Sequence, residues 1–323
     1  MPLHEFDIIK KYFTRPSSHV SVEKSVGDDC AIVNLDPNKQ LLMSMDTLVS
    51  GRHFFEDAAP KDIASRALCT SLSDLAAMGA TPRWFTLGLT LPSCDEKWLQ
   101  QFSQGLFAIA DAFAIDLIGG DTTQGPLTIT VQVHGEVDHG CALRRDQAQV
   151  GDEIFVTGCL GDGAAALALL QHQVCVDHDA QQYLLHRFYS PMPQIDAGQQ
   201  LRGLAHAAID ISDGLLADAQ HIANASHVAL HLNVDCLPVS SHLHSIYSST
   251  TLPWALCGGD DYQLLFPVGC ESLSAVHHLI KQGKLDATSI GHVVEGEPNV
   301  QCFMQGEPYH LDHRQTGYKH FAS

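Results

Sequence analysis

The sequence predicts two domains, each of mixed α/β or α+β class, and three observations support this. A chain of 323 residues exceeds what one hydrophobic core usually supports. Apolar residues recur at strand spacing and at helix spacing in both halves of the chain. Between residues 138 and 152 this periodicity is lost and the turn residues Gly140 and Gly151 appear, so we expect one domain over 1–138 and another over 139–323.

The first half is expected to begin with a short helix and to continue with strands that alternate with two long helices. Leu3, Phe6 and Ile9 repeat at helical spacing. Pro60 near a first turn and Gly79 as a stop signal delimit a stronger helix. The expected elements are a helix at 3–13, strands at 30–35 and 40–46, a helix at 60–77, a strand at 83–91, a helix at 95–113, and strands at 115–119 and 127–137.

In the second half the pattern restarts with the strand-like segment "DEIFVTG". A helix is expected at 162–172, followed by two more helices up to about residue 206. The remaining expected elements are a strand at 207–212, a helix at 214–225, and strands at 228–234, 261–267 and 287–294.

Composition excludes several classes of function. There are 18 lysines and arginines against 37 aspartates and glutamates, a net charge of −19, which argues against a nucleic-acid or anionic-membrane surface. The first residues have no apolar core of signal-peptide length, and nothing approaches 18 consecutive apolar residues, so we expect a cytoplasmic protein. Ten scattered cysteines without a C-x-x-C pair indicate small apolar fillers rather than disulfides or a zinc site.

Aspartate is embedded among apolar or small residues at six places in the chain. An ionised carboxylate in such surroundings is costly unless it is paired, hydrogen-bonded or bound to a metal. Because basic residues are scarce, several of these carboxylates are expected to meet a cation from outside the chain. Each one alone could be a turn residue or a helix cap. The aspartates at these places are Asp28, Asp29, Asp46, Asp74, Asp121, Asp210, Asp213, Asp260 and Asp261.

Local geometry favours a hard cation at these positions. On a strand, Asp210 and Ser212 point to the same side, and Asp213 is at the turn into the next helix. Asp74 is near the carboxyl end of its helix, where the helix dipole disfavours a negative charge, so a ligand explains it better than helix stability does. Carboxylate and hydroxyl oxygens without Cys or His sets predict Mg²⁺ and, with it, substrate phosphates.

The usual nucleotide-binding motifs are missing. No G-x-x-x-x-G-K-[ST] loop occurs, and "GCLGDG" at 158–163 does not match the dinucleotide fingerprint. We interpret that segment as a tight structural turn rather than a phosphate loop. Asp121 follows Gly119 and Gly120, which would let the backbone approach a bulky group such as a phosphate.

Taken in order, the segments "VGDDCAIV", "SMDTLVSGRHF", "SLSDLAAMGA", "LIGGDTTQGPL", "RRDQAQVGDEIFVTG", "AIDISDGLLAD" and "GGDDYQLLF" resemble the thiamine-monophosphate kinase family of the aminoimidazole ribonucleotide synthetase (PurM-like) superfamily. The resemblance extends over nearly the whole chain, to "GYKHF". It implies ATP-dependent phosphorylation of thiamine monophosphate to thiamine diphosphate. It also implies a homodimer paired through N-terminal ATP- and metal-binding domains, with the C-terminal domain completing a cleft.

The resemblance also assigns residues. Several Mg²⁺ ions would be held by Asp29, Ser44, Met45, Asp46, Asp74, Asp121, Asp210 and Asp213. ATP would be contacted by Gly120, Asp121, Arg145 and Ser212. The thiamine monophosphate pocket would be lined by His53, Asp260 and Tyr318. No side chain is expected to act as a general base, because the substrate phosphate is itself the nucleophile.

The chain departs from the family pattern at two positions. Met45 stands where the family often has Thr, so only its backbone oxygen could bind a metal. Asp260 stands where the family often has Glu, a side chain longer by one methylene. From the residues alone, Arg145 could also be a surface residue beside Arg144, and Tyr318 could be a C-terminal anchor.

Two alternatives are weaker. Another ATP-dependent enzyme of the superfamily could act on a different acceptor, but a selenophosphate synthetase should carry a reactive Cys before Cys30. A hydrogenase maturation factor should end in a Cys-bearing tail, whereas this sequence ends "KHFAS". A non-catalytic metal-binding protein of EF-hand type is disfavoured because "DISDGLLADAQH" lacks the required ligand spacing.

Overall fold

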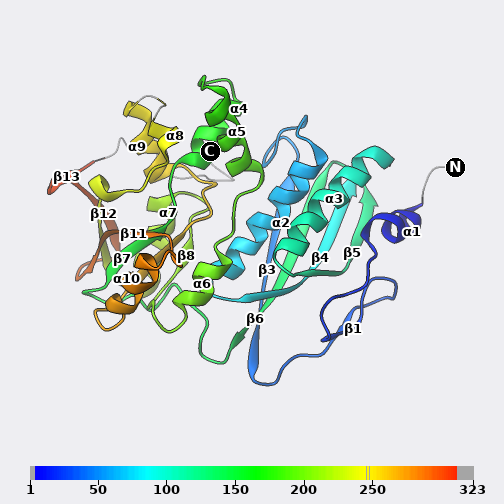
Figure 1. The fold of residues 1–323 in the computed structure, drawn as a ribbon, viewed down its shortest axis with the longest axis horizontal. Helices are drawn as coiled ribbons and strands as arrows, with labels where there is room; N and C mark the ends of the chain where they lie inside the picture. Colours follow the sequence, from blue (N-terminus) through cyan, green and yellow to red (C-terminus); the bar gives the residue numbers. More distant parts are fainter. Residues whose placement is uncertain (1–3, 245, 247, 311–323) are drawn as a thin grey trace. The chain divides into compact units, whose positions relative to one another are not determined.

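The structure is a computed structural model that describes residues 4–244, 246 and 248–310. The chain divides into two compact units, one formed by Met1–Leu75 and Ala80–Gly140, the other by Ala76–Gly79 and Cys141–Ser323. Figure 1 labels the elements of both units in chain order. Strands and helices mix in each unit, which confirms the predicted fold class.

The first unit is built on a four-stranded sheet of order β3-β6-β4-β5, in which β4 and β5 are parallel and the other pairs antiparallel. Its elements are α1 (Glu5–Ile8), the π-helix η1 (Ile9–Phe13), β1 (Val22–Lys24), β2 (Ile32–Val33), β3 (Lys39–Val49), α2 (Pro60–Ala77), β4 (Thr81–Leu91), α3 (Glu96–Ala112), β5 (Asp116–Gln124) and β6 (Thr128–Asp138).

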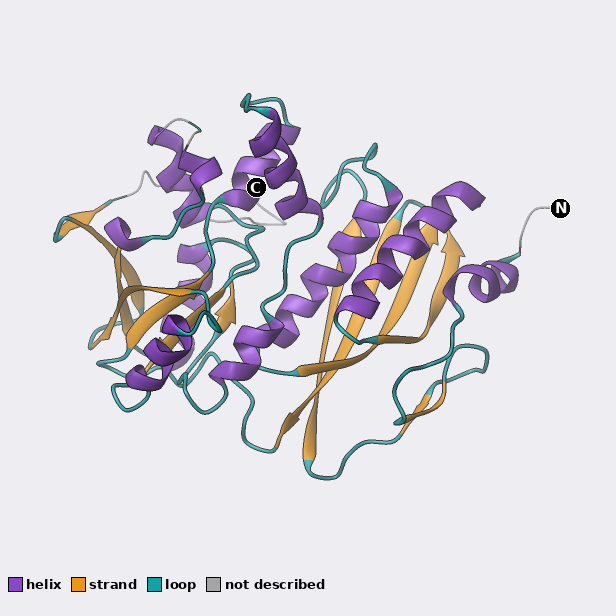
Figure 2. Ribbon diagram, in the orientation of Figure 1, coloured by secondary structure: helices purple, strands orange, loops and turns teal. Residues whose placement is uncertain are grey.

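Helices α2 and α3 cover one face of this sheet (Figure 2). Leu68 and Leu72 of α2 and Phe102 of α3 are fully buried, and the sheet contributes alternate buried residues such as Val131. The helices approach closely at Gly105, where a Cβ atom would lie 2.4 Å from the carbonyl oxygen of Lys61. The strand alternation that the sequence predicts therefore separates a helix-covered face from an opposite face.

The second unit contains a seven-stranded sheet of order β13-β12-β9-β11-β7-β10-β8. Its elements are β7 (Glu153–Thr157), α4 (Asp162–Leu170), α5 (His178–Tyr189), α6 (Ile195–Leu201), β8 (Ile209–Asp210), α7 (Leu215–Ser226), β9 (Ala229–Asn233), the 3₁₀-helix η2 (Val234–Cys236), α8 (Ser241–His244), α9 (Ser248–Cys257), β10 (Leu264–Val268), α10 (Leu273–Lys281), β11 (Ala287–Val294), β12 (Asn299–Met304) and β13 (Glu307–Tyr309).

The edge strand β8 is shorter than the sequence predicts. A strand was expected over 207–212, but only Ile209 and Asp210 pair with β10. Ile211 continues to exchange backbone hydrogen bonds with the loop before β10, since its N–H donates to Gln263 and its carbonyl accepts from Tyr262. The chain thus leaves the sheet early and forms a turn ahead of α7.

No helix in the described part of the chain is long and apolar enough to cross a membrane.

Candidate active site

Four oxygen-bearing side chains meet between β3 and α2 in the first unit. Ser44 and Asp46 are two residues apart on β3 and so point to the same face, the one covered by α2. The Ser44 hydroxyl donates a hydrogen bond to Asp74 Oδ2. Ser71, three residues before Asp74 on the same face of α2, donates its hydroxyl to the Ala67 carbonyl at 3.1 Å and lies close enough to Asp46 to lower its pKa. Three predicted residues, Ser44, Asp46 and Asp74, are therefore brought together.

The electrostatics of this cluster suit a bound cation. Burial, and secondly the nearby charge of Asp74, raise the pKa of Asp46 to about 6. Ser71 acts in the opposite direction but is the smallest of the three causes. Two neighbouring carboxylates that repel one another, with a hydroxyl beside them, are a donor set that Mg²⁺ accepts, because that ion takes one or two carboxylates together with substrate phosphates. The residues present fit the metal.

Gly120 lies in the same cross-strand row as Asp46, on the other edge of the sheet. Asp46 is opposite Val131, and Val131 is opposite Leu87. Leu87 is in turn opposite Gly120. Neighbouring strands lie about 4.8 Å apart, so three steps place the two Cα atoms roughly 14 Å apart within one chain. Asp121, next to Gly120 on β5, is exposed and lies opposite Gly88.

Only glycine fits at position 120. Its φ of +153° is rare for other residues, and a Cβ atom there would lie 2.0 Å from the carbonyl oxygen of Leu87. At Gly119 the nearest atom to a Cβ would be Thr86 Cγ2 at 3.8 Å. The pairing of β4 with β5 shifts by one residue between Phe85 and Thr86, which leaves Ile118 without a partner just before the glycine pair. The strand therefore continues through Asp121 instead of ending before it.

His53 is fixed in the turn that follows β3. Its Nδ1 accepts a hydrogen bond from the N–H of Val49 at 3.0 Å, and the buried Arg66 donates from Nε to the His53 carbonyl at 3.0 Å. Because Nδ1 is an acceptor, the neutral ring carries its proton on Nε2. Nε2 is therefore the hydrogen-bond donor of this ring.

Asp29 lies in a different segment from this cluster, whereas Met45, predicted to act through its backbone oxygen only, lies on β3 between Ser44 and Asp46. Asp29 lies in an exposed bend, where its N–H donates to Asp28 and Asp28 in turn pairs with Lys24. The Met45 side chain is 61% exposed and points away from Ser44 and Asp46. Across the described ranges, no group of three or more Asp, Glu, His or Cys side chains is arranged to hold a metal ion.

In the second unit, Ser212 and Asp213 occupy the turn between β8 and α7. Asp210, at the end of β8, is only 4% exposed, whereas Ser212 and Asp213 are half-buried. Asp218 accepts hydrogen bonds from the N–H groups of residues 212, 213 and 214. Burial raises the pKa of Asp218 to about 7, and the hydrogen bond from the Asp213 N–H acts in the opposite direction.

The loop that carries Asp260 packs directly on this turn. The Asp260 N–H donates to the Ser212 carbonyl at 2.9 Å, and a Cβ at Gly259 would lie 2.4 Å from that same oxygen. Asp260 has a φ of +68°, a conformation that aspartate tolerates better than most residues. Tyr262 donates its hydroxyl to Asp260 Oδ1 at 3.0 Å.

The two adjacent arginines differ in their partners. Arg144 pairs with Asp146 through Nη2 at 2.5 Å. The Arg145 side chain is exposed and makes no ion pair with any described residue, while its backbone carbonyl accepts from Ser226 at 2.8 Å. Arg145 is thus the arginine available to a ligand. Tyr318 lies outside the described residues.

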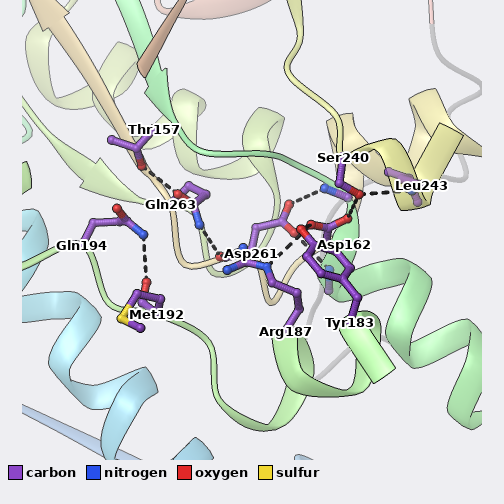
Figure 3. A network of polar contacts seen from close by, with 12 residues as sticks. Thr157, Asp162, Tyr183, Arg187, Met192, Gln194, Ser240, Leu243, Asp261 and Gln263 are labelled. Atoms are coloured by element: carbon purple, nitrogen blue, oxygen red, sulfur yellow. Dashed lines mark hydrogen bonds and ion pairs between the residues drawn. The ribbon is translucent and has the colours of Figure 1, made fainter. Parts of the chain in front are cut away.

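A buried polar network holds the "GCLGDG" turn (Figure 3). Asp261, fully buried, accepts from the N–H groups of Gly161 at 2.7 Å and Gly163 at 3.1 Å. Asp162, also fully buried, accepts from Tyr183 and Ser240, each at 2.6 Å. The N–H groups of Gly161 and Gly163 are thus already bonded within the protein, which supports the interpretation of the segment as a structural turn.

The sequence analysis missed Ser71 and Asp218. Ser71 could have been found, because residues three apart on a helix lie on one face and Asp74 was already a candidate. Asp218, in the first turn of α7, was quoted within "AIDISDGLLAD" but received no role. An acidic residue there resembles an ordinary first-turn helix residue, and only the structure shows which N–H groups it binds.

Comparisons with known proteins show the family of this chain. Two family models match, "AIR synthase related protein, N-terminal domain" over residues 27–137 and "AIR synthase related protein, C-terminal domain" over residues 149–302. A thiamine-monophosphate kinase of Salmonella typhimurium is 44% identical over 326 residues, which cover 100% of both chains.

Two solved structures agree over nearly the full length. The thiamine-monophosphate kinase from Stenotrophomonas maltophilia K279a is 42% identical with a TM-score of 0.86, covering 96% of this chain and 99% of that one. AaThiL complexed with AMPPCP and TMP is 32% identical with a TM-score of 0.77, covering 98% of this chain and 96% of that one. The chain therefore belongs to the thiamine-monophosphate kinase family, within the AIR synthase related proteins.

Proposed function

We propose that this protein, in the cytoplasm, transfers the γ-phosphoryl group of ATP to thiamine monophosphate and so forms thiamine diphosphate. The observation that carries the proposal is the similarity to thiamine-monophosphate kinases over the whole length of both chains. The related AaThiL structure holds AMPPCP, an ATP analogue, together with TMP, so that fold accommodates both reactants at once.

The acceptor supplies its own nucleophile. The second pKa of a phosphate monoester is about 6, so its oxygen is largely ionised near neutral pH and no side chain has to remove a proton. The obstacle is repulsion between two polyanions on a chain that is itself acidic. Positioning and charge neutralisation are therefore what the protein must provide for an in-line transfer.

The cluster around Asp46 and Asp74 is the proposed centre of that neutralisation. Their carboxylates and the Ser44 hydroxyl would hold Mg²⁺, with further ligands from Asp29, the Met45 backbone, Asp121, Asp210 and Asp213. When bound, Mg²⁺ neutralises phosphate charge and orients the groups that react. Residues 1–138 would form the ATP- and metal-binding domain and residues 139–323 the domain that completes the site.

The remaining predicted residues would bind the two reactants. Gly120, Asp121, Arg145 and Ser212 would contact ATP. His53, Asp260 and Tyr318 would contact thiamine monophosphate. Two geometries support this division: Arg145 has an exposed guanidinium without an acidic partner among the described residues, and His53 carries a ring proton on Nε2.

We also propose a homodimer formed through the first unit. Strand β3 is at an edge of the sheet, and its outward residues Met43, Met45 and Val49 are 60%, 61% and 38% exposed. Exposed apolar residues on one face of a strand mark an interaction surface. The opposite face of the sheet is occupied by α2 and α3 (Figure 2).

The direct test is acceptor specificity. Purified protein would be incubated with ATP and Mg²⁺ together with thiamine monophosphate, and separately with thiamine, and thiamine diphosphate would be quantified by chromatography. We expect diphosphate from the monophosphate alone, and none in the presence of EDTA. A folded protein that binds ATP but forms no diphosphate would favour the alternative of a different acceptor.

A further inference from the structure

A buried carboxylate holds the turn that carries Ser212 and Asp213. Asp218 is 3% exposed and lies in the first turn of α7. Its Oδ2 accepts from the N–H of Ser212 at 3.0 Å, of Asp213 at 3.0 Å and of Gly214 at 3.1 Å. Three successive N–H groups that converge on one oxygen form a concave site of the kind that binds anions. Here the Asp218 carboxylate itself occupies that site.

The turn takes part in the regular ladders only at its end, where the Gly214 carbonyl accepts the N–H of Asp218 at 3.0 Å as the first bond of α7. It lies after Asp210, where β8 ends, and before Leu215, where α7 begins. Gly214 has a φ of +117°, and a Cβ there would lie 2.8 Å from the backbone of Cys257. The conformation of residues 212–214 therefore depends on Asp218 from one side and on the neighbouring loop from the other.

The same turn links two groups of proposed ligand-binding residues. The carbonyl of Ser212 accepts the N–H of Asp260, so the position of that backbone also sets the loop proposed to contact thiamine monophosphate. A shift of the 212–214 backbone would move Ser212 and Asp213 directly and Asp260 through this hydrogen bond. A displacement of about 1 Å is enough to lower the rate of a positioned reaction.

We propose that Asp218 is a positioning residue for nucleotide binding, because it fixes the backbone from which Ser212 and Asp213 would reach ATP and Mg²⁺. The proposal rests on the proposed function, which assigns Ser212 to ATP and Asp213 to the metal. Asp218 is 3% exposed and its Oδ2 is taken up by the backbone of the turn, so the proposed role acts through that backbone. A purely structural role would lower stability without altering the nucleotide affinity of the folded protein.

The test compares Asp218→Asn with Asp152→Asn. Asn keeps one acceptor oxygen and nearly the same volume, but it loses the charge that three N–H groups favour. Asp152 is a control of similar burial in the same unit, 2% exposed, accepting the N–H of Gln149 at 2.8 Å and pairing with His206 at 2.9 Å. Binding of AMPPCP with Mg²⁺ would be measured by calorimetry, which needs no turnover, at a temperature where all three proteins are folded.

We expect Asp218→Asn to raise the Kd for AMPPCP at least about tenfold, the size of effect seen when a group that orients a ligand-binding residue is removed. Asp152→Asn should lose stability but keep the Kd unchanged. An unchanged Kd in Asp218→Asn, or an equal loss in both variants, would overturn the proposal. A protein that binds AMPPCP yet makes no thiamine diphosphate would instead contradict the proposed function alone.

A second measurement covers the case in which Asp218→Asn does not fold. Amide hydrogen exchange of the unsubstituted protein would be followed at residues 212–214 with and without AMPPCP and Mg²⁺. Slow exchange that becomes slower on binding is the expected result. Exchange as fast as in the exposed bend around Asp29, or exchange that the ligand leaves unchanged, would contradict a positioning role.

Discussion

Asp46 and Asp74 bring two carboxylates together on the helix-covered side of β3. The raised pKa of Asp46 has burial as its largest cause and the charge of Asp74 as its second. Such an arrangement costs stability when no cation is bound, and perturbed carboxylates of this kind gather at functional sites. We therefore expect the pair to lower the stability of the metal-free protein and to bind a metal ion.

Asp46→Asn should stabilise the metal-free protein by about 1–2 kcal/mol at pH 8, because it removes a buried charge and its repulsion of Asp74. The folded pKa of about 6 is above the ordinary 3.8, so the folded state binds the proton more tightly. Stability from this group is thus greatest below about pH 4 and is lost as the pH rises through 6. Urea unfolding at pH 5 and pH 8 would measure this.

The advantage of Asp46→Asn should shrink at pH 5 and disappear with excess Mg²⁺, which stabilises only the unsubstituted protein. Asp57→Asn, at an exposed position, is the control. It should change neither the stability at the two pH values nor the effect of Mg²⁺ on stability. A variant that is less stable than the unsubstituted protein at pH 8 without metal would show that repulsion does not dominate at this site.

Strand position and helix-end electrostatics single out Asp46 and Asp74 from the residues alone, whereas the predicted metal roles of Ser44 and Asp29 come from the family resemblance. The structure places Ser44 beside Asp74. It places Asp29 in an exposed bend between β1 and β2 that no periodicity describes. Asp218 acts on backbone N–H groups four to six residues earlier in the sequence, and an acidic residue in a first helical turn gives no sign of that.

At the scale of elements, the long periodic segments were predicted well. Helix α2 has the expected bounds of 60–77, because Pro60 and the apolar face mark it clearly. Helix α9 was not predicted, since it contains Pro253 and several Ser and Thr residues. Helix α10 was also missed, because it is short and buries only Val276. The length of strand β8 was overestimated, because an edge strand pairs on one side only.

The β4–β5 pairing gives a paired test with adjacent glycines. Gly120→Ala should destabilise the protein by at least about 2 kcal/mol, because its Cβ would overlap the Leu87 carbonyl. Gly119→Ala should cost less than about 1 kcal/mol, since no atom lies closer than 3.8 Å and its φ is ordinary. Chemical denaturation would give the free energy of unfolding of both variants. Equal losses of stability would mean that the strand relaxes around either side chain.

Strand β3 provides a test of the proposed dimer. Met43→Asp should shift the protein from dimer to monomer, because a charge would be buried at the proposed interface. Light scattering coupled to gel filtration would give the mass directly. Lys97→Asp, on the exposed surface of α3, is the control and should leave the mass unchanged. A monomeric unsubstituted protein would rule out this interface.

At the scale of the whole molecule, a net charge of −19 has to be reconciled with two polyanionic reactants. Association of like charges is unfavourable unless cations intervene. ATP and Mg²⁺ together should therefore raise the melting temperature, by the equivalent of about 2.7 kcal/mol at a ligand concentration of 100 Kd. Thermal melts with ATP and EDTA, and with Mg²⁺ alone, are the controls. An equal rise with ATP and EDTA would show that nucleotide binding needs no metal.

The most direct measurement of the central claim is thiamine diphosphate formation as a function of Mg²⁺ concentration, for the unsubstituted protein and for Asp46→Asn. We expect product from thiamine monophosphate only when Mg²⁺ is present. We also expect Asp46→Asn to lose at least about 100-fold in kcat/KM, more than is lost when a residue behind a metal ligand is replaced. Equal activity and equal Mg²⁺ dependence in the two proteins would contradict the central claim.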